Sequence, residues 1–207
     1  MENTQFRNNS VTVIGKIVSN FKYNHSVYGE SFYLVDLSVN RLSEQVDTIP
    51  LMVSERLIDV TKNYKGCTIE VSGQLRSYNR YEEDKNRLLL YVFMQGVEFW
   101  DGSIDAVENN CIDLNGYICK EPTYRKTPLG REIADLLLAV NRPYGKSDYI
   151  PCIAWGRNAL FTSNLKVGTN IMICGRLQSR EYTKKISDNE TEIRTAYEVS
   201  ISKIVSV

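Results

Sequence analysis

The feature that most constrains this sequence is an internal repeat. Gly15, Asn40-Arg41 and Ile49-Pro50 recur 101 positions later as Gly116, Asn141-Arg142 and Ile150-Pro151. After one inserted residue the spacing becomes 102, and Gly66, Gly73 and Leu75 recur as Gly168, Gly175 and Leu177. A register held over about 70 positions does not arise from composition, so we expect two copies of one domain. We predict an N-terminal domain over residues 1–105 and a C-terminal domain over residues 106–207.

The length and composition suit two small globular domains. The 207 residues allow about 100 per copy, close to the commonest domain size. No apolar run approaches the ~18 residues of a membrane-spanning helix, and we expect a cytoplasmic protein. The five cysteines form no Cys-x-x-Cys pair and His25 is the only histidine. This pattern argues against a zinc site or a disulfide framework, so we predict no metal and no cofactor.

Most segments of each copy alternate apolar and polar residues, as half-buried β-strands do. The alternation covers residues 11–14, 32–39 and 68–72, and it recurs at 112–114, 133–140 and 170–173. Residues 54–66 break it, with apolar residues at helical spacing between a serine and a glycine, and residues 157–168 are their counterpart. These two segments predict short helices. Each copy then continues into two strands joined by a polar hairpin, at residues 78–87 and 182–195. Three strands, a helix and two strands is the order of an OB-fold, so we predict an all-β protein of two tandem five-stranded OB barrels, each with one short helix.

Ordered motifs also run the length of the second copy. They are Asn115-Gly116, Pro122 to Thr127 with Gly130, Leu138 to Arg142, Trp155 to Ala159, and Gly175 to Tyr182. In this order they resemble the bacterial single-stranded DNA-binding protein family, and two copies resemble its tandem-domain branch. The first copy matches only through the repeat, because Phe21 and Asn24 stand where the family motif has proline and arginine. The resemblance implies a non-enzymatic protein that binds single-stranded DNA in replication, repair or recombination, with replication proteins as candidate partners.

Strand alternation indicates which side chains of the second copy face outward. Ile150, Cys152 and Ala154 suit a barrel interior, so Tyr149 and Trp155 are expected to share the outer face. In residues 171–182 the odd positions are apolar or glycine as far as Leu177. The outward positions of that segment are Met172, Arg176, Gln178, Arg180 and Tyr182.

Binding of single strands without sequence preference requires rings on which bases stack and cations for the phosphates. By resemblance, Tyr144, Tyr149, Trp155 and Tyr182 stand at the positions of the family's base-stacking aromatics, and Arg125, Arg157 and Arg180 at positions along its DNA path. Arg142, Arg176, Lys184 and Lys185 complete the predicted nucleic-acid-binding set, and we predict no catalytic residue. For Lys184 and Lys185 the alternative stays open, because paired lysines at an exposed turn are usually solvated.

Comparison between the copies separates packing from binding. The first copy has Ser43, Thr48, Ser54 and Arg80 where the second has its four rings, whereas Ile49, Leu51 and Val53 keep the inward positions apolar. Core positions are retained and rings are not, which indicates that the rings of the second copy serve binding. The first copy is expected to be a degenerate OB-fold with an auxiliary or assembly role. Its outward positions include Arg76, Tyr78 and Arg80, but also Glu70.

The tandem branch implies an assembly as well. Tandem members pair two chains to present four barrels, so the resemblance predicts a homodimer. It places the contacts between chains at the first strand of each barrel, residues 11–15 and 112–116.

Two other classes of function stay open at this stage. A module like the primosomal replication proteins would bind mainly another protein, and the zero net charge and the lack of the family's acidic tip in this sequence favour it mildly. A nuclease would need carboxylates at metal-binding spacing, and Glu82-Glu83-Asp84 lie in a predicted hairpin that is too mobile to hold a metal. Stacking ignores the 2′-hydroxyl, so DNA and RNA are not distinguished.

Overall fold

The computed structural model describes residues 8–43, 45–82, 85–102, 108–185 and 191–206. The N-terminal half contains strands β1 (Asn9–Ile17), β2 (Lys22–Val27), β3 (Glu30–Asn40), β4 (Val46–Ser54), β5 (Thr68–Glu82) and β6 (Lys85–Phe99). The C-terminal half contains β7 (Asn110–Ile118), β8 (Thr123–Lys126), β9 (Glu132–Asn141), η2 (Pro143–Gly145), β10 (Ser147–Trp155), α1 (Arg157–Thr162), β11 (Asn170–Lys185) and β12 (Thr191–Ser206). The predicted domain boundary between residues 105 and 106 lies outside the described residues.

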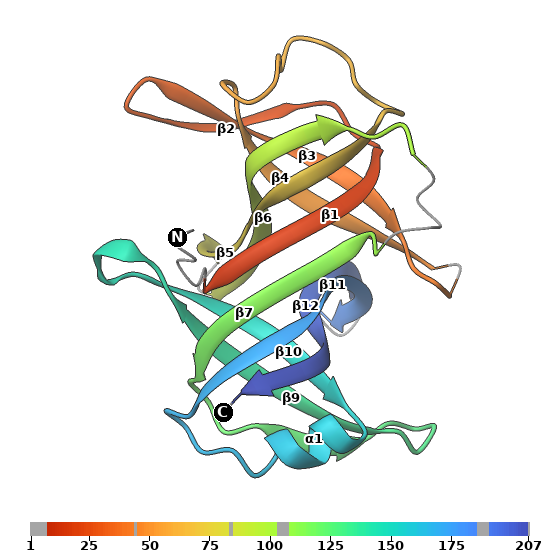
Figure 1. Cartoon of the computed structure of the whole chain (residues 1–207), viewed down its shortest axis with the longest axis vertical. Coiled ribbons are helices and arrows are strands. Elements are labelled where there is room, and N and C mark those ends of the chain that lie inside the picture. The colour runs from red at the N-terminus through yellow and green to blue at the C-terminus, as the bar shows by residue number, and fades with distance from the viewer. Residues whose placement is uncertain (1–7, 44, 83–84, 103–107, 186–190, 207) are drawn as a thin grey trace, which may run out of the picture.

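Each half closes into a barrel of five strands (Figure 1). In the N-terminal half, β1 pairs with both β3 and β5, and the circuit continues through β4 and β6. In the C-terminal half, β7 pairs with both β9 and β11, and β10 and β12 complete the circuit. The short strands β2 and β8 extend β3 and β9 as hairpins. The predicted all-β OB-fold class is therefore confirmed.

The alternation of the sequence explains why these segments are strands. Val35, Leu37 and Val39 of β3 are buried, with partly exposed residues between them, and Ile150, Cys152 and Ala154 of β10 are buried too. Ile153 breaks the alternation of β10, because it is also buried. Because successive side chains of a strand point to opposite faces, one set fills the barrel and the other faces outward.

Gly15 and Gly116, which recur at matching positions, mark places where two backbones approach closely. A Cβ atom on Gly15 would collide with the carbonyl oxygen of Ser38, and one on Gly116 would lie 2.8 Å from that of Ala139. At these points β1 and β7 cross to β3 and β9 to close their barrels. Glycine recurs at matching positions of the two copies because any side chain there would hold the barrel open.

The predicted helix of the first copy is wrong. After β4 ends at Ser54, residues 55–66, all of which the structure describes, form turns and bends, and only the second copy has its helix, α1. The Asp59 carboxylate accepts hydrogen bonds from the backbone N–H and the hydroxyl of Thr61, and Asn63 accepts one from the N–H of Lys65. Such local side-chain bonds stabilise turns at the expense of a helix, and the β-branched Ile58 and Val60 weaken helix formation further.

The two barrels are joined through their first strands. β1 and β7 pair antiparallel, with Val11 opposite Ile112, so a single sheet of 12 strands runs through both halves (Figure 1). The sequence predicted contacts between chains at residues 11–15 and 112–116. The structure instead pairs these segments with each other, because a second copy in the same chain can occupy the edge that a separate chain would occupy.

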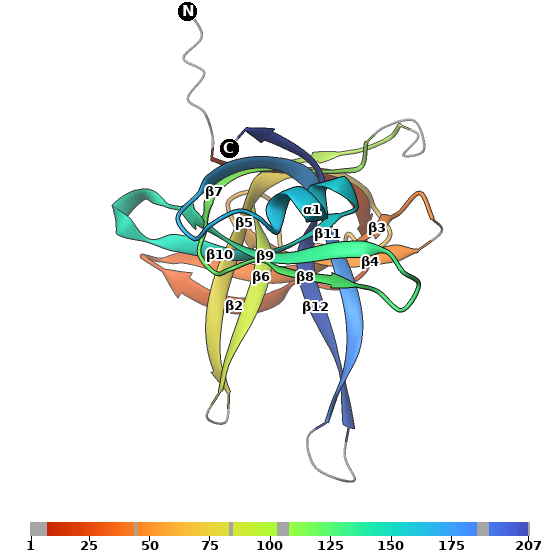
Figure 2. The same ribbon diagram turned by 90° about the horizontal axis from the view of Figure 1, so that it is seen from below.

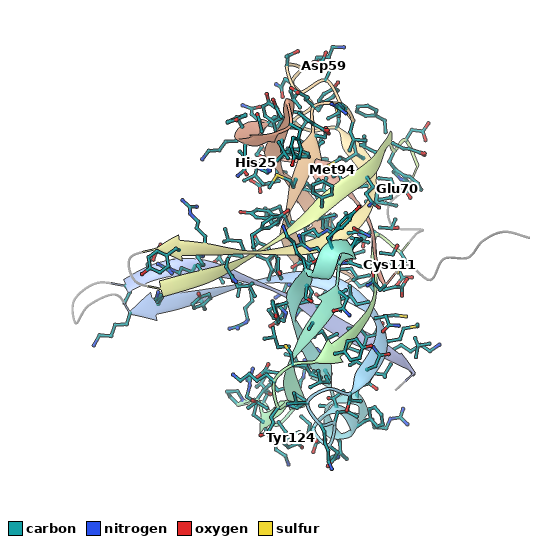
Figure 3. The ribbon with its side chains drawn as sticks, turned by 90° about the vertical axis from the view of Figure 1, so that its left-hand side faces the viewer. His25, Asp59, Glu70, Met94, Cys111 and Tyr124 are labelled. Carbon is teal, nitrogen blue, oxygen red and sulfur yellow. The ribbon has the colours of Figure 1, made fainter. Side chains whose placement is uncertain are left out.

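Two long hairpins define one side of the molecule. The β5–β6 and β11–β12 hairpins extend beyond the barrels and project side by side in the same direction (Figures 2 and 3). Within the described residues, no helix has both the length and the apolar composition that crossing a membrane requires.

Candidate nucleic-acid interface

A groove crosses from one half to the other at the base of the β11–β12 hairpin. It has a volume of about 960 Å³, and we call it the central groove. The C-terminal half contributes Trp155, Arg125, Arg180 and Tyr197, and the N-terminal half contributes Asp36, Arg41 and Thr48. Three predicted site residues, Trp155, Arg125 and Arg180, therefore lie together.

Trp155 is the flat ring of this groove. It ends β10 on the outer face, and 37% of its surface is exposed, whereas Ala154 beside it is fully buried. The indole N–H donates to the Ser200 hydroxyl, with 3.1 Å between nitrogen and oxygen. This bond holds one edge of the ring while part of its surface stays open, which is the arrangement that base stacking needs.

The cations of the central groove differ in how far other groups engage them. Arg125 donates to Asp135 at 2.7 Å, and this pair is half-exposed. Burial lowers the pKa of the Arg125 guanidinium, but the hydrogen bond to Asp135 outweighs it and raises that pKa, so this group stays charged. Arg180 is exposed, and in the described part of the chain its guanidinium has no ion-pair partner. Arg180 is therefore the cation best placed to receive a phosphate.

Tyr197 lines the central groove and was missed by the sequence analysis. It shares the inward parity of Val199 and Ile201 on β12, but it is only half-buried against the core and its remaining surface faces the central groove. Burial raises the pKa of its hydroxyl to about 12, so the ring is neutral at physiological pH. Strand parity alone assigns Tyr197 to the core, and its exposure to the groove is seen only in the folded structure.

Arg142 lies at the junction of the halves. It pairs with Asp148, whose side chain is fully buried, and it donates to the Ser77 carbonyl at 3.1 Å. Arg76 donates to the same carboxylate at 3.2 Å, and so does the backbone N–H of Ser77 at 2.6 Å. The predicted contact residue Arg142 is therefore engaged by a buried carboxylate.

The repeat produces a matching junction on the other side. Arg41 pairs with Asp47 at 2.6 Å, and both contact Ser179 of the C-terminal half. Burial alone would raise the pKa of Asp47, but hydrogen bonds from Arg41 and Ser179 outweigh it and lower that pKa. The recurrence of the arginine in both copies is thus explained by its pairing with a buried aspartate that bonds to the opposite half.

The remaining predicted residues lie along three elements. Tyr149 is 44% exposed at the start of β10, and its backbone N–H donates to the Ser77 hydroxyl of the N-terminal half. With a rise of about 3.3 Å per residue along a strand, the six-residue separation places Tyr149 roughly 20 Å from Trp155. Tyr144 is fully exposed in the preceding turn, with a φ of 64°. Tyr182, Lys184 and Lys185 follow one another along β11 in the hairpin.

Arg176 and Arg157 complete the set. Arg176 is half-buried on β11 opposite Ser200, the residue that holds the Trp155 ring. Arg157 is exposed at the start of α1. Among the residues that the structure describes, no three histidine, cysteine, aspartate or glutamate side chains are grouped as a metal site would need.

Comparisons with known proteins agree on one family. The pattern that defines the Single-strand binding protein family matches residues 109–206. Single-stranded DNA-binding protein A of Bacillus subtilis is 39% identical over 80 residues, which cover 35% of this chain and 46% of that protein. The Single-stranded DNA-binding protein of Halalkalibacterium halodurans is 36% identical over 80 residues, covering 48% of its length. The chain thus spans about half the length of the curated relatives that it matches.

A solved structure extends the similarity in fold to both halves. The wild-type single-stranded DNA binding protein from Thermus aquaticus superimposes with a TM-score of 0.69, covering 96% of this chain and 92% of that one. At 20% identity, this match concerns the fold alone. The similarity to the Single-strand binding protein family therefore lies in the C-terminal half, residues 109–206, whereas the similarity in fold extends to both halves.

Proposed function

We propose that this protein binds single-stranded DNA without sequence preference and catalyses no reaction. The observation that carries the proposal is the central groove, where the partly open Trp155 ring lies in the same hollow as Arg125 and Arg180. Every base has a π-face, so stacking on such a ring tolerates any sequence, and phosphate contacts to arginine add affinity without sequence information. The names of the relatives support DNA as the ligand.

The path of the strand follows from the order of the rings. Trp155 and Tyr149 lie on one face of β10 at opposite ends, so a single strand would reach them through successive nucleotides. Tyr182 and the two lysines that follow it extend the contact along the β11–β12 hairpin. We infer that the C-terminal half carries most of the affinity and that the N-terminal half is auxiliary. A cytoplasmic role in replication, repair or recombination is consistent with this ligand.

A titration of fluorescently labelled oligo-dT at two salt concentrations tests the proposal. We expect saturable binding at low salt that weakens as salt rises, because phosphate contacts release counterions. If oligo-dT fails to bind at low salt, the proposal is wrong. Binding that is indifferent to salt would favour a module that mainly recognises another protein, as the primosomal replication proteins do.

A further inference from the structure

The N-terminal barrel lacks a ring at the position of Trp155. Ser54 stands there, nearly buried, and its hydroxyl donates to the Glu30 carboxylate. By comparison of the two copies alone, this face would have lost its stacking surface. The structure shows that rings occupy it from neighbouring strands.

Three rings form a row on this face. The His25 ring stacks on Phe32 with 5.1 Å between centroids and 14° between planes. Phe32 contacts Phe93 at 5.8 Å and 34°. Both phenylalanines are half-buried, so each retains exposed surface. In Figure 3, His25 lies on the side of the barrel toward which the hairpins project, and Glu70 lies on the other side.

Strand register relates this row to the Trp155 site. Phe32 is opposite Ser54 just as Ile133 is opposite Trp155, and Phe93 is beside Met52 just as Ser200 is beside Ile153. The C-terminal half therefore has one large ring on β10 between neighbours that are not aromatic. The N-terminal half has a small residue on β4 between two large rings on β3 and β6. Ring surface is retained at the same place, but it comes from different strands.

Two of these rings, Phe32 and Phe93, line a groove. It has a volume of about 680 Å³ and is bordered by Phe32, Phe93, Ser54, Gln95 and Arg56, and also by Glu30, the carboxylate that pairs with Arg56. Small-molecule sites are commonly about 300–1,000 Å³ in volume, mostly apolar, with a few polar groups at their edges. The Arg56 side chain is 70% exposed, and its guanidinium lies 3.4 Å from Glu30, so it can turn toward a phosphate at the rim.

We propose that Phe32 and Phe93 form a second base-stacking site, which binds nucleobases of the same strand that occupies the central groove. The inference rests on the proposed function. It gives the N-terminal half a base-stacking contact, although this half has no aromatic residue at the four positions where the C-terminal half has its rings. The flat rings select bases, and Arg56 is the phosphate contact of this site.

The C-terminal half supplies the substitutions for a test. The variant F32I/F93S carries the residues found at the matching positions, Ile133 and Ser200, which the other barrel already accommodates. Affinity for poly(dT) long enough to reach both halves should fall about five- to 150-fold for each stacked base removed, the range found for rings in single-strand binding proteins. The number of nucleotides covered per chain should fall too, while quenching of Trp155 by a short oligo-dT should stay at the wild-type level. If coverage and affinity are unchanged and only the melting temperature falls, the rings serve packing and the inference is overturned.

A second measurement uses the wild-type protein and does not depend on the folding of a variant. Photo-crosslinking to bromodeoxyuridine-substituted oligonucleotides, mapped by mass spectrometry, should label peptides that contain Phe32 or Phe93 as well as the peptide that contains Trp155. Crosslinks at Trp155 with none in the N-terminal half would overturn this inference and leave the proposed function standing. Failure of the wild-type protein to bind any oligonucleotide would remove both.

Discussion

At the scale of single residues, exposure on the outer face does not by itself identify a binding residue. Trp155 and Arg180 lie on the face that strand parity predicts, and they share a hollow. Arg142 belongs to the same predicted set, yet it bonds to the buried carboxylate of Asp148. Trp155 and Arg180 are exposed to a ligand, whereas the Arg142 guanidinium is engaged by Asp148. This difference can be measured.

Replacement of Trp155 by alanine should weaken oligo-dT binding about five- to 150-fold, since a stacked base is worth roughly 1–3 kcal/mol in single-strand binding proteins. The melting temperature should change little, because the ring is partly exposed. Tyr117→Ala is the matched control, an aromatic with 44% exposure on β7 that does not line the central groove. With only two tryptophans in the chain, loss of the DNA-induced quenching in Trp155→Ala would identify the reporter. A collapsed fold with intact affinity would show that the ring belongs to the core.

Replacement of Arg142 by alanine should act mainly on stability. Removal of one partner from a buried ion pair costs about 3–5 kcal/mol when nothing else compensates the remaining charge. Arg76 and the backbone N–H of Ser77 still donate to Asp148, so the cost here should be smaller than that. Thermal unfolding should therefore occur at a clearly lower temperature, whereas the exposed Arg157→Ala should unfold like the wild type. An Arg142→Ala protein that melts normally and binds DNA weakly would instead return this residue to the interface.

At the scale of elements, equivalent segments of the two copies have diverged in different ways. The core strands keep their register, whereas the segment after β4 is a set of turns and the segment after β10 begins with helix α1. The hairpins diverge in charge. Lys184 and Lys185 extend β11, and the corresponding part of the first copy contains Glu82-Glu83-Asp84.

The charge of the second copy predicts the salt dependence of binding. About four phosphate contacts, each contributing about −0.7, should give a slope near −3 in a plot of log affinity against log salt concentration. The candidate cations that the sequence offers are Arg125, Lys126, Arg142, Arg157, Arg176, Arg180, Lys184 and Lys185. In K184A/K185A the slope should become less negative, by about 0.7 for each phosphate that is no longer neutralised. Lys16→Ala on β1 is the control and should keep the wild-type slope, whereas an unchanged slope in the double variant would exclude these lysines.

At the scale of the whole molecule, the halves form a single structural unit. The β1–β7 pairing continues the sheet across the junction, and Asp47 and Asp148 each fix the end of a strand in one half to a strand of the other. The central groove draws its walls from both halves, so neither barrel alone contains all of it. This arrangement resembles a dimer of single barrels whose two members have been joined in one chain.

If two such chains pair to present four barrels, light scattering should give about twice the 23.7 kDa chain mass. The β1 and β7 edges pair within the chain, so the contact between chains must use another surface. Single-strand binding should leave the number of chains in the assembly unchanged. A protein that remains monomeric across the micromolar range would rule the homodimer out.

The order of residues in the sequence was enough to predict the repeat, the strands and the outward direction of Tyr149, Trp155 and Arg180. All of these follow from alternation, because successive residues of a strand point to opposite faces. The prediction of a helix at residues 54–66 was wrong, although its cause is also local. The hydrogen bonds that Asp59 and Asn63 make within turns compete with helix formation.

The residues that meet across strands could be found only in the folded molecule. The sequence predicts a DNA contact for Arg142 because it does not reveal the partner Asp148, which lies buried against β5 of the other half. The rings of Phe32 and Phe93 are 61 positions apart in sequence, and they meet because β4 pairs with both β3 and β6. A comparison of the copies position by position finds only a missing ring at Ser54. Side chains from neighbouring strands fill one surface in space, and the order of residues along the chain does not reveal that surface.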